Sequence, residues 1–378
     1  MKKIILLVLG IVLCQTLFAQ RVASVRQDGR FGFIKEDGSW LIEPTYTKAG
    51  SFSDGVAAVL VGKKWGFVDR TGKIIIEPSF DKVKRFDSGI AVVAKSKKWF
   101  YIDKTGKEVE MPNSEKIFDF NNGIALIKQN GKIGFINTSG KIILEPTYTK
   151  AYPFKNGYSK VLKGESWGVI DSNGKEFIEP AYQGIGYPSE GVTVVRKNEE
   201  FGLVINGTYT KVEGVTKIWD FQNGEKLTFA RNAEKKMGFI DRNGKWVIEP
   251  SFIKVRKFSN GLASVTTGGK KWGYINEKGE NIIKEQFRDA EYFSKDGFAP
   301  VKINKLWGFI NNKGDLVIED KYVISAMSFS NLFKSKAKGF VNGLSRVGYK
   351  KKWGFINTKG ELLNDTWYQN AEGFVDIK

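Results

Sequence analysis

Residue types that carry much of enzyme chemistry are nearly missing from this chain. Histidine is absent, and cysteine occurs once, at Cys14. Cys14 lies in an N-terminal apolar stretch that we expect to be removed, so the remaining chain has no thiol for a disulfide, a thiolate metal site or a nucleophile. Catalytic triads that need histidine or cysteine are thereby excluded.

The N-terminus predicts a secretory signal peptide over residues 1–19. Met1-Lys2-Lys3 precedes an apolar stretch from Ile4 to Val12, and Leu17-Phe18-Ala19 follows, which is the charged, apolar and small-residue order of such signals. We expect cleavage near Ala19 and export to the periplasm, the outer surface or the medium. No later apolar stretch approaches the roughly 20 residues of a membrane-spanning helix. We therefore expect no transmembrane segment in the mature chain.

Acidic residues are too few to balance the basic ones. The formal charge of +19 falls to +17 without Lys2 and Lys3, and the basic residues are spread along the chain. Such a charge predicts attraction to anionic surfaces but says nothing about the fold. Export argues against nucleic acid as the partner.

A helical period of 3.6 is also missing, and an internal repeat takes its place. An aromatic or apolar residue, followed in nine units by glycine and in one by Phe100, recurs at steps of 34 residues and later of 36, 35, 35 and 46. The ten positions are Phe31, Trp65, Trp99, Ile133, Trp167, Phe201, Met237, Trp272, Trp307 and Trp353. The chain therefore contains about ten units of roughly 34 residues.

Each unit predicts three β-strands, which we name a, b and c. In the second unit, strand a starts at Gly55, strand b surrounds Trp65, and strand c ends near Phe80. Polar and glycine residues predict a hairpin between a and b, and an Asp/Asn-x-x-Gly turn joins b to c. A Glu-Pro pair follows in five units, and we expect its proline to end strand c because proline cannot donate to a ladder. A linker then leads to Phe-x-x-Gly and the next strand a.

This pattern resembles the WG-repeat family, also called KWG repeats. The resemblance rests on Lys-Trp-Gly-Phe-Ile/Val-Asp/Asn, on the Gly-Lys turn exit and on Glu-Pro-x-Tyr/Phe, and it covers essentially all of residues 21–378. Departures are Phe100 in place of glycine, Ile133 and Met237 in place of tryptophan, and the sixth unit, which lacks Glu-Pro. The resemblance implies a β-repeat scaffold with no single activity attached.

The recurring tryptophans allow two interpretations. They could form a row of platforms for sugar rings or bases, or a stacked aromatic core between neighbouring units. We favour the core, because phenylalanine, isoleucine and methionine replace tryptophan in other units and preserve bulk but not the flat indole. The expected core residues are Trp65, Trp99, Trp167, Trp272, Trp307 and Trp353.

A second repeated feature is a carboxylate that follows the turn glycine. It could form a metal-binding ladder, but the glycine-dense loops of calcium-binding repeats are missing, so we expect pairing with the turn lysines and neither a metal nor a cofactor. Every prominent acid belongs to the repeat, whereas a catalytic pair should be unique. The carboxylates are Glu43, Glu77, Glu145, Glu179, Glu249, Glu319 and Asp365.

Two regions, 207–236 and 322–352, interrupt the repeat. The first contains Trp219-Asp220-Phe221, and the second carries about a dozen extra residues with Lys334, Lys336 and Lys338. A solvated surface loop is the simpler interpretation of the second region, and a site for an anionic ligand is the functional one. If it is a site, changing the three lysines to serine should weaken salt-dependent binding and leave the melting temperature nearly unchanged.

Units of this length favour one domain, residues 20–378, folded as an open, curved or superhelical all-β array. A closed, propeller-like ring is the alternative. We do not prefer it, because propeller blades usually have four strands and about 40 or more residues, which units of three strands and roughly 34 residues do not match. The last strand, near Phe374, is expected to cap the array. For function, we expect an exported, non-catalytic scaffold that binds a protein or an anionic cell-envelope glycan over an extended face. The alternative is a glycan-processing enzyme that uses a carboxylate pair.

Overall fold

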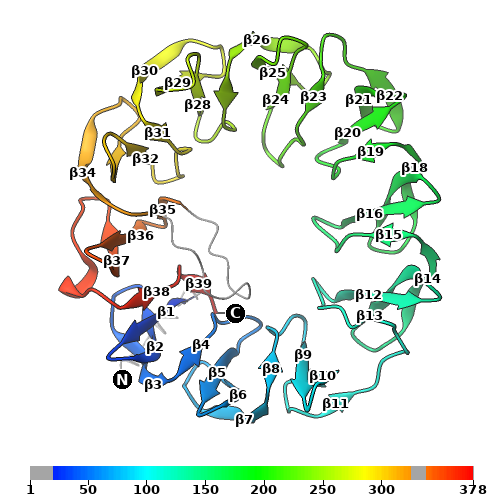
Figure 1. The fold of residues 1–378 in the computed structure, drawn as a ribbon, viewed down its shortest axis with the longest axis vertical. Coiled ribbons are helices and arrows are strands. Elements are labelled where there is room, and N and C mark those ends of the chain that lie inside the picture. Colours follow the sequence, from blue (N-terminus) through cyan, green and yellow to red (C-terminus); the bar gives the residue numbers. More distant parts are fainter. Residues whose placement is uncertain (1–19, 325–337, 378) are drawn as a thin grey trace, which may run out of the picture.

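The computed structural model describes residues 20–324 and 338–377 and arranges them as a ring of ten small antiparallel sheets, or blades (Figure 1). The all-β prediction is confirmed, because the one helical element in these two ranges is the short 3-10 turn η1 (Leu363–Asp365). Within the same ranges, no helix is long and apolar enough to cross a membrane.

Blade 2 illustrates how strands follow one another from the inner edge of the ring to its outside. The order is β4 (Lys48–Ala49), β5 (Ala57–Val61), β6 (Lys64–Val68) and β7 (Ile74–Phe80), which are a short inner strand and the predicted strands a, b and c (Figure 1). The short strand was not predicted. It forms in the linker after the preceding strand c and gives the blade the four strands of a propeller.

Most other blades repeat this order, but blade 4 has no inner strand, and β35 of blade 10 is formed by the Phe-x-x-Gly turn. Blade 1 contains β1 (Arg21–Gln27), β2 (Arg30–Lys35), β3 (Trp40–Tyr46), β38 (Asn370–Ala371) and β39 (Val375–Asp376). Blades 3 and 4 contain β8 (Lys82–Val83), β9 (Ile90–Lys95), β10 (Lys98–Asp103), β11 (Glu108–Val109), β12 (Ile124–Gln129), β13 (Lys132–Asn137) and β14 (Ile142–Tyr148). Blades 5 and 6 contain β15 (Lys150–Ala151), β16 (Tyr158–Lys163), β17 (Ser166–Asp171), β18 (Glu176–Tyr182), β19 (Gly184–Ile185), β20 (Val192–Lys197), β21 (Glu200–Ile205) and β22 (Thr208–Lys211).

The remaining strands complete the ring. Blades 7 and 8 contain β23 (Lys217–Ile218), β24 (Leu227–Arg231), β25 (Met237–Asp241), β26 (Trp246–Phe252), β27 (Lys254–Val255), β28 (Leu262–Thr266), β29 (Trp272–Asn276) and β30 (Asn281–Phe287). Blades 9 and 10 contain β31 (Asp289–Ala290), β32 (Ala299–Lys302), β33 (Trp307–Ile310), β34 (Leu316–Tyr322), β35 (Phe340–Val341), β36 (Leu344–Tyr349) and β37 (Lys352–Asn357). Region 207–236 thus supplies strands of blades 6 and 7.

The last strands close the ring, so the preferred open array was wrong and the alternative ring is correct. In blade 1, β38 pairs with β1 through Val25 and Ala371, and β39 pairs with β1 through Val22 and Val375. The C-terminal segment therefore fills the inner edge of the first blade and does not cap a free end. This pairing covers the inner edge of β1, which an open array would leave unpaired.

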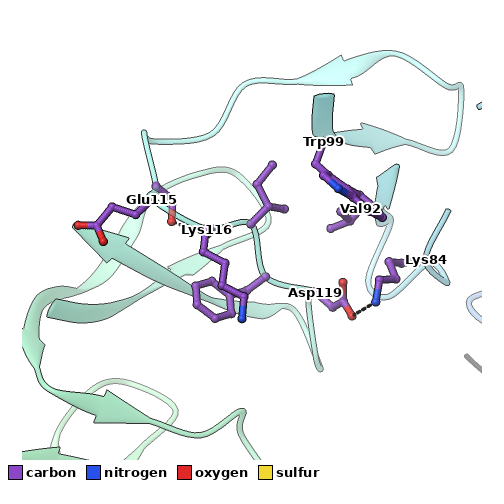
Figure 2. A pocket seen from close by; sticks show the side chains of 9 residues that line it. Lys84, Val92, Trp99, Glu115, Lys116 and Asp119 are labelled. Atoms are coloured by element: carbon purple, nitrogen blue, oxygen red, sulfur yellow. Dashed lines mark hydrogen bonds and ion pairs between the residues drawn. The ribbon is translucent and has the colours of Figure 1, made fainter. Parts of the chain in front are cut away.

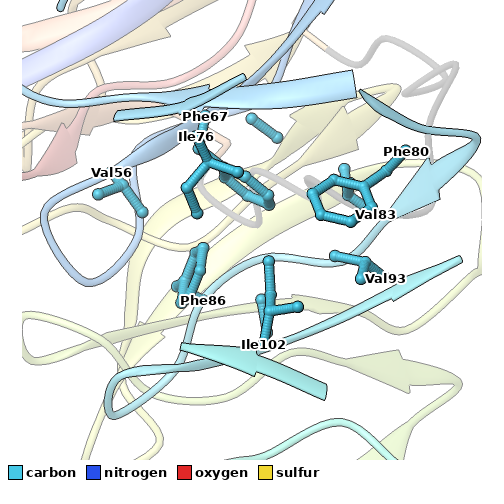
Figure 3. Packing of buried hydrophobic residues seen from close by; sticks show 10 residues of the cluster. Val56, Phe67, Ile76, Phe80, Val83, Phe86, Val93 and Ile102 are labelled. Atoms are coloured by element: carbon cyan, nitrogen blue, oxygen red, sulfur yellow. The ribbon is translucent and has the colours of Figure 1, made fainter. Parts of the chain in front are cut away.

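The hydrophobic core lies between neighbouring blades. Between blades 2 and 3, Phe67 of strand b meets Phe86 of the next Phe-x-x-Gly turn edge to face, with ring centroids 4.8 Å apart (Figure 3). The same contact recurs between Phe33 and Phe52 at 4.8 Å. Such aromatic pairs each add roughly 0.5–1.5 kcal/mol beyond their area burial. No blade buries these rings alone, so the units are stable only when stacked.

The glycine after the motif tryptophan makes room for strand c. In blade 2, Phe67 of β6 is opposite Ile76 of β7, and Trp65 is opposite Phe80. Strand c therefore has extra residues between these two pairs and bulges over Gly66. A Cβ at Gly66 would lie 2.5 Å from the carbonyl oxygen of Ile76. Phe100 occupies this place in blade 3, and the outer strand β11 there has only two residues.

Proline does not end strand c, contrary to our expectation. Pro78 lies inside β7, at the bulge. Because β7 is the outer strand of its sheet, the missing N–H of proline leaves no ladder bond unmade.

The predicted b–c turns are confirmed. In blade 2, the Thr71 hydroxyl donates to Asp69 Oδ1 at 2.7 Å and the Lys73 N–H to the same oxygen at 3.1 Å, while Gly72 has a φ of +86°. These bonds, with the Thr71 hydroxyl first, lower the pKa of Asp69.

Candidate binding surface on the inner edge of the ring

Two residues lie on the inner edge of each blade, directly before the phenylalanine or proline that opens the Phe-x-x-Gly turn. Their residue types differ from blade to blade. In five blades one of these positions is aromatic. We name these five residues the inner arc: Phe118, Tyr152, Tyr187, Trp219 and Tyr292, from blades 4, 5, 6, 7 and 9. Blades 2 and 3 have Gly50-Ser51 and Lys84-Arg85 at the same positions. The ring is thus regular in its core and asymmetric along its inner edge.

Every ring of the inner arc has a lysine ammonium over it. Lys217 Nζ lies 4.5 Å from the ring centroid of Trp219, and Lys116 Nζ lies 5.1 Å from that of Phe118. For Tyr292, Lys257 Nζ lies at 5.8 Å. Each such pair is attractive by roughly 0.5–1 kcal/mol at an exposed site. The arc therefore presents positive charge together with aromatic surface.

Tyr152 and Tyr187 share one lysine. Lys160 Nζ lies 4.9 Å from the Tyr152 ring and 4.8 Å from the Tyr187 ring, and the Tyr187 hydroxyl donates to the Pro153 carbonyl at 3.0 Å. Burial lowers the pKa of Lys160, against the opposing effect of Asp220, and burial also raises the pKa of Tyr187. Tyr152 itself remains 47% exposed. Neighbouring blades therefore form one continuous cationic and aromatic surface.

Shallow pockets lie along this arc. One of about 690 Å³ includes Lys84, Trp99, Lys116 and Phe118, and Figure 2 shows Lys84 paired with Asp119 beside it, their charged atoms 3.7 Å apart. A second pocket, of about 670 Å³, runs over blades 7 to 9. Its lining includes Lys217, Trp219, Phe229, Arg256, Glu291 and Tyr292. The arc therefore offers concave surface for side chains of a partner.

Of the three lysines proposed as an anion-binding loop, only Lys338 is within the described residues; Lys334 and Lys336 lie outside them. Lys338 Nζ pairs with Glu291 Oε1 at 2.8 Å, and Arg256 lies 3.6 Å from the same oxygen. Glu291 is buried, with 5% exposure, and lines the pocket over blades 7 to 9. Lys338 thus neutralises a buried carboxylate at the edge of this pocket.

A second largely buried carboxyl group, Glu372, faces Arg346 at 3.8 Å. Burial raises the pKa of Glu372 and lowers that of Arg346. Glu291 and Glu372 belong to different blades, and each has its own arginine. They therefore do not resemble the two facing carboxyl groups of a glycosidase.

The motif tryptophans lie among the blades. Trp272 and Trp307 are buried, and Trp65, Trp99, Trp167 and Trp353 are half-buried. Arg256 lies 4.6 Å from the ring centroid of Trp272, and Tyr152 of the inner arc lies 5.6 Å from Trp167. Their role as core residues stays a prediction.

The repeated carboxylates lie one per blade on outer strand c or, for Asp365, in η1, and all are exposed: Glu43, Glu77, Glu145, Glu179, Glu249, Glu319 and Asp365. In the described ranges, Glu319 is the only one in an ion pair, with Lys321 at 3.7 Å, so the expected pairing with the turn lysines was wrong. Those ranges also contain no cluster of three potential metal ligands.

A family model described as WG containing repeat matches residues 31–65, 65–99, 99–132, 133–166, 167–201, 237–270, 272–307 and 307–322. The chain belongs to the WG containing repeat family. The structure shows that here a WG repeat spans two blades, because strands b and c of one blade precede the inner strand and strand a of the next. A search of curated proteins found no match.

Solved structures similar to this WG-repeat ring have low sequence identity. "Crystal structure of the eukaryotic initiation factor" aligns with a TM-score of 0.49 and 10% identity over 94% of this chain and 97% of that one. BamB from Moraxella catarrhalis gives 0.33 and 11% over 78% and 97%, and Hsv2p from Kluyveromyces lactis gives 0.35 and 12% over 70% and 99%. All three TM-scores are below 0.5 and carry no argument about function.

Sequence reasoning missed the inner arc, apart from noting Trp219 in an irregular region. The signal was present: when the units are aligned on the phenylalanine of Phe-x-x-Gly, the two preceding positions vary while the flanking positions repeat. Variable positions inside a regular repeat are where a repeat scaffold adapts to its ligand.

Proposed function

We propose that this protein is an exported, non-catalytic scaffold that binds a partner protein along the inner arc. The observation that carries the proposal is the set of lysine-covered aromatic rings on five blades. Aromatic residues and cations are typical of the energetically important parts of protein interfaces. The WG tryptophans lie instead among the blades and leave recognition to the variable positions.

A protein partner fits the arc better than a glycan. Sugar rings stack on open aromatic faces, but lysine ammonium groups already lie over the arc rings, at 4.5 Å in the case of Trp219. Acidic and apolar side chains of a protein can pair with these lysines and enter the shallow pockets without displacing them. We therefore expect a partner segment that combines carboxylates with apolar residues.

Photo-crosslinking tests this proposal. A benzophenone amino acid would replace Tyr152 or Trp219 in the arc, and, as the control, Phe177, which is 46% exposed on outer strand β18. Both arc positions should give an adduct of the same mass in envelope extracts, and position 177 should not. An adduct from position 177 alone would overturn the proposal. Binding of a purified polysaccharide that Tyr152→Ala abolishes would point to a glycan instead.

A further inference from the structure

The two ends of the ring can be distinguished by the hydrogen bonds between blades. Neighbouring Phe-x-x-Gly turns bond to one another: the Gly89 N–H donates to Asp54 Oδ2 at 2.5 Å, and the Ser259 hydroxyl donates to the Phe293 carbonyl at 2.6 Å. These turns therefore share one end of the ring. The b–c turns lie there too, as the ion pair of Lys104 with Asp54 at 3.0 Å indicates. We call this end the turn face.

The a–b hairpins lie at the opposite end, because strand a begins at the turn face and runs away from it. We call that end the hairpin face. Its ten hairpins contain seventeen lysines and arginines and five acidic residues. The hairpins are residues 27–30, 61–64, 95–98, 129–132, 163–166, 197–200, 232–236, 266–271, 303–306 and 349–352.

The turn face has no such excess. Its b–c turns and Phe-x-x-Gly turns contain fourteen lysines and arginines and fourteen acidic residues. The b–c turns are residues 35–39, 69–73, 103–107, 137–141, 171–175, 205–208, 241–245, 276–280, 311–315 and 357–361. The Phe-x-x-Gly turns are residues 52–55, 86–89, 120–123, 154–157, 188–191, 221–224, 258–261, 293–297 and 340–343. The positive charge of the connections is thus higher on the hairpin face, where Asp81, Glu115 and Glu285 of neighbouring strands and linkers accept hydrogen bonds from some hairpin residues.

The short inner strands add a second row of cations to the hairpin face. Six blades start this strand with an exposed lysine: Lys48, Lys82, Lys116, Lys150, Lys217 and Lys254, where Lys116 takes the equivalent place in blade 4. Within the described ranges, none of these six forms an ion pair.

Where the inner-strand lysine is missing, its neighbour on strand a supplies the charge. Gly184 of blade 6 pairs with Arg196, and Asn370 of blade 1 pairs with Arg26. Asp289 of blade 9 likewise pairs with Lys302. Directly opposed residues of an antiparallel pair share one face of the sheet, so nine of the ten blades have a cation at this place. In blade 6 Arg196 pairs with Glu199, and in blade 9 Lys302 stands opposite Asp289.

Apolar side chains accompany these cations. Val61 and Leu306 are 44% and 38% exposed on their hairpins. At the same end, Ile253 is 42% exposed just before β27, and Val323 is 41% exposed where it bridges Gly348 in blade 10. The turn face also has exposed apolar residues: Val341 lies in a turn, and others follow a b–c turn within two residues, namely Ile74, Phe177, Val247, Ile282, Leu316 and Val317. A surface that combines lysines with single apolar residues matches the boundary between lipid headgroups and acyl chains.

We propose that the hairpin face docks on a membrane surface whose headgroups carry anionic phosphate. The cations surround the whole ring, so they match a plane of repeating charges, whereas a linear polymer would meet only the blades along its path. Most are lysines, which act as point charges and need no bidentate geometry. Docked in this way, the ring presents its turn face away from the membrane. Lys116 and Lys217 belong to both surfaces, whereas Lys160 and Lys257 of the inner arc lie outside the hairpin-face rows and are left to a partner.

Vesicle sedimentation tests the docking with two matched variants. The hairpin variant carries Lys63→Ser, Lys132→Ser, Lys270→Ser and Lys305→Ser, and the turn variant carries Lys73→Ser, Lys141→Ser, Lys175→Ser and Lys313→Ser. All eight lysines are exposed, and both variants lose the same charge. The vesicles contain phosphatidylcholine alone or with phosphatidylglycerol, at low and high salt.

The wild-type protein should bind the phosphatidylglycerol vesicles, and binding should weaken as salt rises. Each lysine near an anionic membrane strengthens binding roughly fivefold, so the hairpin variant should bind on the order of several hundredfold more weakly. The turn variant should bind within a few-fold of wild type. Both variants should elute and melt like the wild type.

Three results would overturn the proposal. Equal losses in the two variants would mean that net charge alone drives binding. Equal binding to neutral vesicles would mean that the charge is irrelevant. Failure to bind either vesicle, with binding to a soluble anionic polysaccharide that only the hairpin variant loses, would assign the face to a glycan.

Discussion

Alanine at Gly66 should force strand c of blade 2 away from strand b. The new Cβ would lie 2.5 Å from the Ile76 carbonyl oxygen and 2.8 Å from the Pro78 nitrogen, whereas real Cβ atoms essentially never come within 3.0 Å of such atoms. Both contacts are backbone, so no side-chain rotation relieves them. The strand must move by about half an ångström or lose its pairing, and overpacking of this kind costs about 1–3 kcal/mol.

Blade 3 contains the natural counterpart of this change. With Phe100 at the glycine position, its outer strand is the two-residue β11, whereas β7 of blade 2 has seven residues. We therefore expect Gly66→Ala to lower the thermal and urea midpoints and to expose the outer strand of blade 2 to hydrogen exchange. The exchange should not change in blades far from blade 2.

Gly268→Ala is the matched control, because a Cβ at Gly268 meets nothing within 4 Å and its φ is not positive. This variant should unfold within about 0.5 kcal/mol of the wild type. If Gly66→Ala were as stable as Gly268→Ala, the close crossing of strand c would not be the reason for the motif glycine.

Three further predictions follow from burial and hydrogen bonding. Trp307→Ala should lower the free energy of chemical unfolding by about 3–5 kcal/mol, the range for truncation of a buried large aromatic side chain. A loss below about 1 kcal/mol would contradict the core role of Trp307. Because turn hydrogen bonds lower the pKa of Asp69 and Asp103 below 3.8, they stabilise the fold above that pH, and the benefit is lost as pH falls through the lowered values. Thermal melts between pH 5 and 2 should therefore depend less on pH in the double Asp→Asn variant, and an unchanged slope would refute this. Lys338→Ser should lower the free energy of unfolding by only about 1 kcal/mol, because solvent screens the ion pair of a half-exposed lysine. A thermal melt should show this loss, which contradicts the nearly unchanged melting temperature expected from the sequence.

The sequence predicted the parts of the fold that one unit encodes. Strand a, strand b and the turn from Asp69 to Gly72 follow from local pattern, and the structure has them. The inner strand, such as Lys48–Ala49, is too short to produce a period. Ring closure depends on the pairing of Val22 with Val375, which lie near opposite ends of the chain. It also depends on the small rotation between neighbouring blades, which the sequence of a single unit does not specify.

The candidate surfaces were harder to predict than the fold. The inner arc was missed because Tyr152, Tyr187 and Trp219 do not repeat by residue type. The charge polarity was hidden because hairpin lysines such as Lys63 and turn lysines such as Lys73 alternate along the chain, so that the charge looks uniform. Only the antiparallel order of strands assigns them to opposite faces.

Both proposed surfaces require a closed ring, and an engineered disulfide tests closure most directly. Arg26 of β1 and Asn370 of β38 are directly opposed, at the separation that a cross-strand disulfide spans. With Cys14 replaced by serine, the double variant Arg26→Cys, Asn370→Cys should form an intramolecular disulfide on mild oxidation, run faster on a non-reducing gel and melt at a higher temperature. Free thiols or only intermolecular disulfides under the same conditions would mean that the array is open.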